Sequence, residues 1–385
     1  MIIKSVGAKS IFDFRKEKTI SVTINTNVGK FSSSSPSGKS TGKFEKKIYK
    51  KDLETDIKTL KKFSDYFSEE VLEKFEDLRR IEDILDRHVG ANTIFAIESA
   101  ALKAMAKEKN KQVWEIINSE SKKFPRLVGN CIGGGLHSKT KNKKPDFQEF
   151  LIISDRKNPT DNYESNKKIQ KEVGEDLKTQ DKNFEDKKND ENAWITSLNE
   201  KEILELLKKK KVPLGVDVAA SSFYGRKKYR YENPMLTRVK EEQLGYISNL
   251  IKNFNLFYVE DPLEEEDFEG FAKLTKKFPD SLIVGDDLIV TNSKRLEKAI
   301  KMGSVSAIIV KPNQCGSLIE VERVCNLAKK NNIKVVFSHR SGETGEDILA
   351  DLAFGFQADF LKCGVDGKGR VEKIKRLIEI QNSLS

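Results

Sequence analysis

Short apolar runs that each end in a polar or charged residue recur through the second half of the chain. Six of them lie at residues 214–216, 257–259, 282–285, 307–310, 335–337 and 360–361. A continuous apolar run is typical of a strand that is covered on both faces, as in a parallel sheet. Helix-like segments separate the six runs, and this alternation predicts an α/β fold with a TIM-like β/α barrel.

The residues that end these runs carry charge. Asp217, Glu260, Asp286, Lys311 and Lys362 each stand at such an end, and residues 338–343 follow another run with two serines, a histidine, an arginine and a glutamate. In a β/α barrel the carboxyl ends of the strands surround the active site. The pattern therefore predicts one charged cup at the mouth of the barrel.

The N-terminal part of the chain has other periodicities. Residues 20–24 alternate apolar and polar side chains, which predicts a half-buried strand, and residues 51–120 carry apolar residues at helical spacing. A chain of 385 residues is too long for one ordinary core. We therefore expect an N-terminal α+β capping domain over residues 1–124 and a catalytic barrel domain over residues 125–385.

A small, polar, glycine-containing loop at residues 32–42 follows the first strands, and we expect it to be mobile. Gly38, Lys39 and Ser40 imitate the end of a phosphate-binding loop. However, Ser33 stands where that motif has its first glycine, and no strong helix signal follows. The loop therefore does not predict a nucleotide site.

Three further polar residues are candidates for a site because of their surroundings. His137 follows three glycines, which permit close approach of the backbone. Glu149 lies within the apolar segment 147–153, and a buried acid needs a partner. Glu191 stands in an acidic stretch just before Trp194.

Charge and cysteine content narrow the class of protein. The formal net charge is +10, but lysine and glutamate are interspersed, which is more typical of a solvated surface than of a nucleic-acid site. The four cysteines have no CxxC spacing, which favours reduced thiols in a cytosol. We find no long apolar segment and no signal peptide. We therefore expect a cytoplasmic location and no membrane role.

Several motifs together resemble the enolase family along almost the whole chain. They are Pro36-Ser37-Gly38-x-Ser40-Thr41-Gly42, Val89-Gly90-Ala91-Asn92, Gly134-Gly135-x-His137, Gln148-Glu149-Phe150, Asp190-Glu191, Asp217-x-Ala219-Ala220-Ser221, Glu260-Asp261-Pro262, Gly285-Asp286-Asp287-Leu288-x-Val290-Thr291-Asn292, Lys311-x-Asn313-Gln314 and Ser338-His339-Arg340-Ser341-Gly342-Glu343-Thr344. The last four, in this order and spacing, are the most specific. The resemblance implies a lyase of glycolysis that interconverts 2-phosphoglycerate and phosphoenolpyruvate.

The same resemblance implies a role for each matching residue. The ligands of a tightly held Mg²⁺ are then Asp217, Glu260 and Asp286, and Ser40 helps to hold a second Mg²⁺ that arrives with the substrate. Lys311 is the base, and Glu191 is the acid at the leaving hydroxyl, with Glu149 as its neighbour. The residues that contact the substrate are then His137, Glu149, His339 and Lys362. Those that bind its phosphate are Arg340 and Ser341. A homodimer is also implied.

The expected chemistry agrees with these residue types. Removing a proton next to a carboxylate creates a dianionic enolate, and Mg²⁺, which prefers carboxylate and water ligands, acts as a Lewis acid on the substrate carboxylate. A lysine base must be neutral, although its reference pKa is about 10.4. We expect nearby Mg²⁺ and Lys362 to lower the pKa of Lys311 by repulsion between like charges.

The chain departs from the family pattern at several loops. The differences are Lys16-Glu17-Lys18, Lys39, Gly133, Leu136, Asn192-Ala193 and Pro312. They bear on loop closure and substrate fit more than on the metal site. Two alternatives therefore stay open: a paralogue that acts on another phosphorylated carboxylate, and a non-catalytic binding protein that uses its lysine-rich surface.

Overall fold

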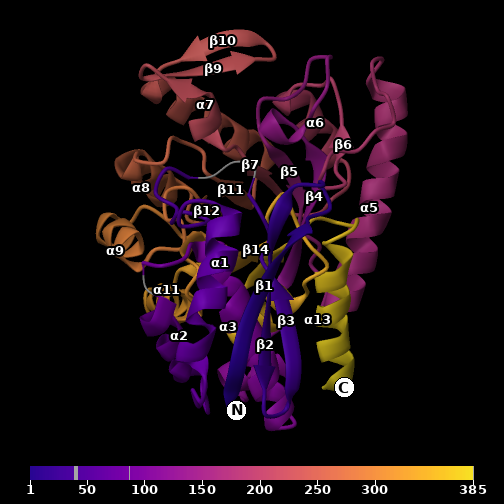
Figure 1. Ribbon diagram of the computed structural model, residues 1–385. Helices are drawn as coiled ribbons and strands as arrows, with labels where there is room; N and C mark the ends of the chain where they lie inside the picture. The colour runs from indigo at the N-terminus through magenta and orange to yellow at the C-terminus, as the bar shows by residue number, and fades with distance from the viewer. Residues whose placement is uncertain (39–41, 86, 385) are drawn as a thin grey trace.

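The chain folds into an N-terminal sheet covered by helices, followed by a barrel of alternating strands and helices (Figure 1). The computed structural model describes residues 1–38, 42–85 and 87–384. Ser40 and its neighbours Lys39 and Thr41 lie outside the described residues. Among the described residues, no helix combines the length and the apolar composition that a membrane crossing requires.

The N-terminal sheet has three antiparallel strands in the order β1-β2-β3, which are Ile3–Phe12, Lys18–Thr26 and Gly29–Ser34. The predicted alternation at residues 20–24 lies in β2, where Ile20, Val22 and Ile24 are fully buried. Helices follow: α1 Leu53–Phe63, α2 Leu78–Leu85, α3 Ala91–Glu108 and α4 Val113–Asn118, with short 3-10 turns at Ser64–Phe67 and Phe75–Asp77. Asp52 begins α1 because its side chain accepts a hydrogen bond from the Thr55 amide.

Eight strands close the barrel, and the prediction of a β/α barrel is confirmed. They are β4 Arg126–Gly133, β5 Glu149–Ile152, β7 Leu214–Asp217, β11 Tyr258–Glu260, β12 Leu282–Gly285, β13 Ala307–Val310, β14 Lys334–Ser338 and β15 Phe360–Lys362. Neighbours in this order pair with one another, and β15 pairs back to β4 in parallel, with Phe360 opposite Arg126. The two-residue strand β6, Trp194–Ile195, adds to β4.

One strand runs against the others, which the apolar pattern did not predict. β5 is antiparallel to both β4 and β7. The segment between β4 and β5 holds only a 3-10 turn, Gly135–His137, and lacks the α-helix that usually joins parallel strands. As a result the first residue of β5, Glu149, lies opposite the last residue of β7, Asp217.

Nine helices of the described chain follow the barrel strands. They are α5 Pro159–Gln180, α6 Glu200–Lys208, α7 Lys240–Phe254, α8 Phe268–Lys277, α9 Ser293–Met302, α10 Pro312–Cys315, α11 Leu318–Lys330, α12 Ile348–Gly355 and α13 Val371–Ser383. Side chains of Asn158, Asn199, Asn292 and Ser317 cap four of them. A small antiparallel sheet, with a 3-10 turn Ala220–Phe223 before β8 Tyr224–Gly225, β9 Lys228–Glu232 and β10 Met235–Arg238, stands beside α7 at one end of the molecule (Figure 1).

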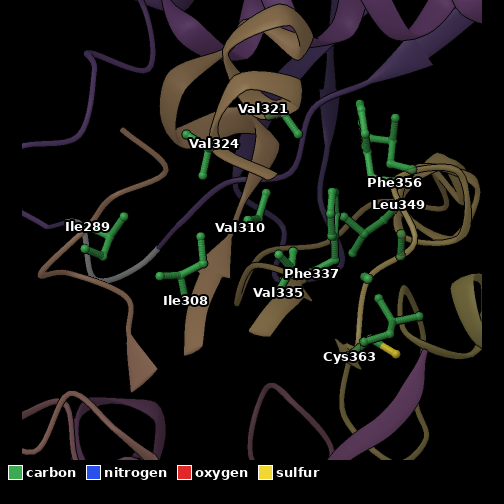
Figure 2. Close-up of a cluster of buried hydrophobic side chains, with 14 of the residues drawn as sticks. Ile289, Ile308, Val310, Val321, Val324, Val335, Phe337, Leu349, Phe356 and Cys363 are labelled. Atoms are coloured by element: carbon green, nitrogen blue, oxygen red, sulfur yellow. The ribbon is translucent and has the colours of Figure 1, made fainter. Parts of the chain in front are cut away.

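The barrel strands are apolar throughout because both of their faces are covered. Ala307 and Ile309 belong to a cluster inside the barrel. Their neighbours on β13, Ile308 and Val310, point outward into a second cluster, which includes Val321 and Val324 of α11 (Figure 2). The alternation of the strand thus divides one continuous apolar run between two cores.

Candidate active site

Most of the predicted site residues line one cavity at the carboxyl ends of the strands. Its lining includes His137, Glu149, Glu191, Asp217, Lys311, His339, Arg340, Ser341 and Lys362. Most come from a strand end or the loop after it. Glu149 reaches the same rim because β5 is reversed, and Glu191 lies in the segment between α5 and β6. Gly38 and Gln148 also line the cavity, and the Gln148 amide lies 3.3 Å from Asp217 Oδ2.

Lys362 is surrounded by three carboxylates. Its Nζ lies 3.0 Å from Asp217 Oδ2, 2.9 Å from Glu260 Oε2 and 3.5 Å from Glu149 Oε2. Burial by itself lowers the pKa of Lys362, but these carboxylates outweigh it and raise the pKa well above the usual value. The lysine is therefore a fixed positive charge in the floor of the cavity.

Lys311 makes an ion pair with Asp286, whose other oxygen accepts a hydrogen bond from Gln314 Nε2 at 3.2 Å. Burial, and then repulsion from Arg340 and Lys362, lower the pKa of Lys311, but its interactions with nearby carboxylates, Asp286 first and then Glu260, together outweigh them and the pKa is raised. The expectation of a lowered pKa is wrong for the ion-paired lysine. Lys362 does repel Lys311 as expected, but the sequence did not reveal the contact with Asp286.

Two groups of described residues hold possible ligand atoms within 4.8 Å of one another. One is Asp261, Asp286 and Asp287, and the other is His137, Glu149 and Glu191. The expected trio of Asp217, Glu260 and Asp286 is not one of these groups: Lys362 contacts the first two, and Lys311 contacts the third. Sequence reasoning passed over Asp261 and Asp287, although each directly follows a predicted ligand.

Asp261 ties the ends of two strands together. Its Oδ1 accepts a hydrogen bond from the Asp286 amide at 2.9 Å, and its Oδ2 accepts one from the Asp287 amide at 2.8 Å. Burial, together with the neighbouring acids Asp287 and Asp286, raises the pKa of Asp261 well above its usual value. Asp261 thereby fixes the backbone from which Asp286 projects.

The acids at this rim fit a hard divalent cation. Glu260 is fully buried, and within the described part of the chain its Oε1 has no hydrogen-bond partner. Burial and the nearby Asp217 raise the pKa of Glu260 to about 8. A buried carboxylate oxygen without a partner is costly, and a divalent cation that prefers oxygen ligands satisfies it.

A second acid–base group lies across the cavity from Lys311. His137 Nδ1 is 3.3 Å from Glu191 Oε1 and 3.9 Å from Glu149 Oε1, and Asn130 Nδ2 donates to Glu191 Oε2 at 3.0 Å. Burial raises the pKa of Glu149 well above its usual value. Burial also raises the pKa of Glu191, but the neighbouring His137, His339 and Arg370 together outweigh this, and the pKa falls well below the usual value. The surroundings therefore shift the pKa values of the two carboxyls in opposite directions.

His339 and Arg340 follow β14. Burial lowers the pKa of His339 well below its usual value, so the imidazole is neutral. The Arg340 guanidinium, only 3% exposed, forks onto both oxygens of Glu45 at 3.1 and 3.2 Å and reaches Asn313 Oδ1 at 3.2 Å. A Cβ at Gly38 would lie 2.0 Å from Arg340 Nη2, so this position accepts only glycine. Glu45 was not foreseen.

Buried lysines and acids at the strand ends of a β/α barrel suit enzymes that remove a proton beside a carboxylate. Comparison with known proteins narrows this class. Residues 3–117 match the family model for the N-terminal domain of enolase, and residues 121–385 match the model for the enolase C-terminal TIM barrel domain. The chain belongs to the enolase family.

Curated relatives agree over the whole length. An enolase of Methanosphaera stadtmanae is 35% identical over 407 residues, which cover 100% of this chain and 97% of the relative. An enolase of Picrophilus torridus is 34% identical over 406 residues and 99% of each chain. An enolase of Pyrobaculum aerophilum is 37% identical over 333 residues, 83% of this chain and 77% of the relative. The activity is that of a phosphopyruvate hydratase, a lyase of glycolysis.

Proposed function

We propose that the cavity catalyses the reversible dehydration of 2-phosphoglycerate to phosphoenolpyruvate, with the residue roles expected from the sequence. The observation that carries this proposal is the convergence of lysines, buried carboxyls and an arginine on one cavity. In this arrangement Lys311 takes the proton next to the substrate carboxylate. For this step it must first give up its ion pair with Asp286, because only the neutral amine is a base.

The acids on the opposite side of the cavity protonate the hydroxyl as it leaves. Glu191 faces the hydroxyl and acts as its acid, and the neighbouring Glu149, whose pKa burial raises, passes a proton to Glu191. His137 lies in contact range of both carboxyls and keeps them in place. His137, His339 and Lys362 orient the substrate, and Lys362 opposes its growing negative charge.

Arg340 and Ser341 bind the phosphate in this proposal. An arginine fork matches two phosphate oxygens, and Glu45 occupies the same fork in the structure. The phosphate must therefore share or displace Glu45.

Asp217, Glu260 and Asp286 would hold a Mg²⁺ ion, with Asp261 and Asp287 fixing the backbone nearby. Bound there, the ion supplies a Lewis acid for the substrate carboxylate. Ser40, outside the described residues, is proposed to help hold a second Mg²⁺ that arrives with the substrate. We further propose a capping domain at residues 1–124, a catalytic domain at residues 125–385, a homodimer and a cytoplasmic location.

A coupled assay tests the proposed reaction. With Mg²⁺ the purified protein is expected to form phosphoenolpyruvate from 2-phosphoglycerate, and Lys311→Ala is expected to reduce kcat by roughly 10³-fold or more, as for loss of a general base. Lys301→Ala, at an exposed lysine near the end of α9, serves as the matched control and should keep full activity. No turnover in the wild-type protein would rule the proposal out.

A further inference from the structure

A lysine-lined cavity of about 570 Å³ lies outside the active-site cavity. Residues 139–143 form one wall, and residues 183–187 together with 195–197 form the other. Among the described residues, the two cavities share no lining residue. Its size is that of a small-molecule site rather than of an extended nucleic-acid groove.

The charge of this lysine-lined cavity is positive. Lys139, Lys141, Lys143 and Lys187 line it, against the single acid Glu185. Glu185 is already engaged, because it accepts hydrogen bonds from Lys187 Nζ at 2.7 Å and from Asn142 Nδ2 at 3.0 Å. Like charges held around one concavity repel each other, and a multivalent anion between them relieves this repulsion. The chemistry therefore favours a compact molecule with two or more phosphates.

Both walls continue directly into active-site residues. Lys139 is the second residue after His137, and Lys144 Nζ ties the lysine-rich segment to the same turn by donating to the Gly135 and Ser138 carbonyls at 2.7 and 3.0 Å. On the other wall, Asn189 Oδ1 accepts from the Glu191 amide at 3.0 Å. The ends of the two walls thus carry the two side chains whose contact is 3.3 Å.

We propose that the lysine-lined cavity is a second anion site, which binds a compact polyphosphorylated molecule and alters turnover by drawing its two walls together. The hydrogen bond from Asn142 to Glu185 already joins the walls, so an anion held by lysines of both walls needs only a small further closure. The effect on turnover rests on the proposed function. The binding itself does not.

Binding is tested by calorimetric titration with inorganic tripolyphosphate in Mg²⁺-free buffer. The titration is run on the wild type and on Arg340→Gln, which removes the proposed phosphate grip of the active site. We expect binding to persist in Arg340→Gln and to weaken at least tenfold when Lys141→Glu and Lys143→Glu are added. The matched control is Lys168→Glu with Lys171→Glu, which makes the same charge change at exposed positions of α5.

Three results would overturn the site. They are no binding at millimolar tripolyphosphate, binding that disappears with Arg340→Gln alone in a variant whose circular dichroism is native, and equal weakening by the control pair. The last result would show only a response to net charge. All four reversed lysines are exposed, so the variants are expected to fold.

The coupling is tested by the coupled assay at constant free Mg²⁺. Tripolyphosphate is expected to change kcat or KM at least threefold in the wild type and not in Lys141→Glu with Lys143→Glu. If tripolyphosphate binds but changes neither kcat nor KM, the proposed coupling is wrong and the proposed anion site stands. A protein that binds tripolyphosphate but never turns over 2-phosphoglycerate defeats the proposed function instead.

Discussion

Among the residues of the site, Arg340 is held by hydrogen bonds at both its guanidinium and its backbone amide. Three of its hydrogen bonds go to Glu45, and its backbone amide donates to Glu343 Oε1 at 2.8 Å. Glu343 is held in turn by Lys373 at 2.7 Å. The position of the guanidinium is therefore determined from both ends, as recognition of a planar, two-oxygen partner requires.

Arg340→Lys tests whether the fork, rather than its charge, binds the substrate phosphate. A lysine keeps the charge but loses the planar fork that holds two oxygens at once, and a charge-assisted hydrogen bond contributes about 2 kcal/mol. We therefore expect KM for 2-phosphoglycerate to rise roughly 30-fold. Arg323→Lys is the control, because Arg323 is 61% exposed and its salt bridge is on the surface. An unchanged KM in Arg340→Lys would contradict the assigned role.

The sequence predicted which residues carry charge at the strand ends but not how they pair. The family resemblance assigned Lys311 as the base, yet its ion pair with Asp286 depends on two side chains that meet from different strands. Glu45 was missed for the same reason, because it is far from Arg340 along the chain and lies just outside the motif at residues 36–42. Gln148 and Asp261 could have been predicted, because each is next to a predicted site residue in the sequence.

Helix α6 places an acid in an unusual position. Glu200 is its first residue and is 2% exposed, and its Oε1 accepts a hydrogen bond from the Asp146 amide at 2.7 Å. Burial raises the pKa of Glu200 from 4.5 to about 7, with Asp146 adding to the effect. The folded protein thus retains a proton that the unfolded chain releases near pH 4.5.

This proton makes stability depend on pH. A carboxyl whose pKa is raised by folding does not lower the free energy of unfolding below pH 4.5. Above pH 4.5 it lowers the free energy of unfolding progressively, by about 3 kcal/mol at about pH 7. Glu200→Gln keeps an acceptor for the Asp146 amide and cannot ionise. The free energy of unfolding of this variant, measured in urea, is expected to fall less than that of the wild type between pH 4.5 and 7. Parallel pH curves would contradict this prediction.

The observed helices and strands agree with those predicted from the sequence where the spacing of apolar residues was regular. Helix-like segments were expected between the six apolar runs, and α7, α8, α9, α11 and α12 lie there. The sheet β8–β10 was missed because its strands are short and lie outside the barrel. The direction of β5 was missed because apolar content reports burial and says nothing of strand direction.

Across the whole molecule, a bound ion would join strands that belong to different parts of the barrel. A ligand that binds only the folded state stabilises it by about 2.7 kcal/mol at one hundred times its Kd. We expect Mg²⁺ to raise the Tm of the wild type by a few degrees. Asp286→Asn should lose most of this shift, whereas Asp280→Asn, at an exposed position before β12, should retain it. The readout is a thermal scan with and without Mg²⁺, and an equal shift in both variants would place the ion elsewhere.

The pairing of β15 with β4 has a consequence for biosynthesis. The ribosome delivers β15 after every other strand of the barrel, so the ring of strands stays open until residues 360–362 have emerged. Until then Asp217 and Glu260 lack the ammonium group of Lys362, which arrives with the closing strand. A nascent chain halted before residue 360 would therefore hold these two acids without their cation, and catalytic competence would appear only after the closing strand has been made.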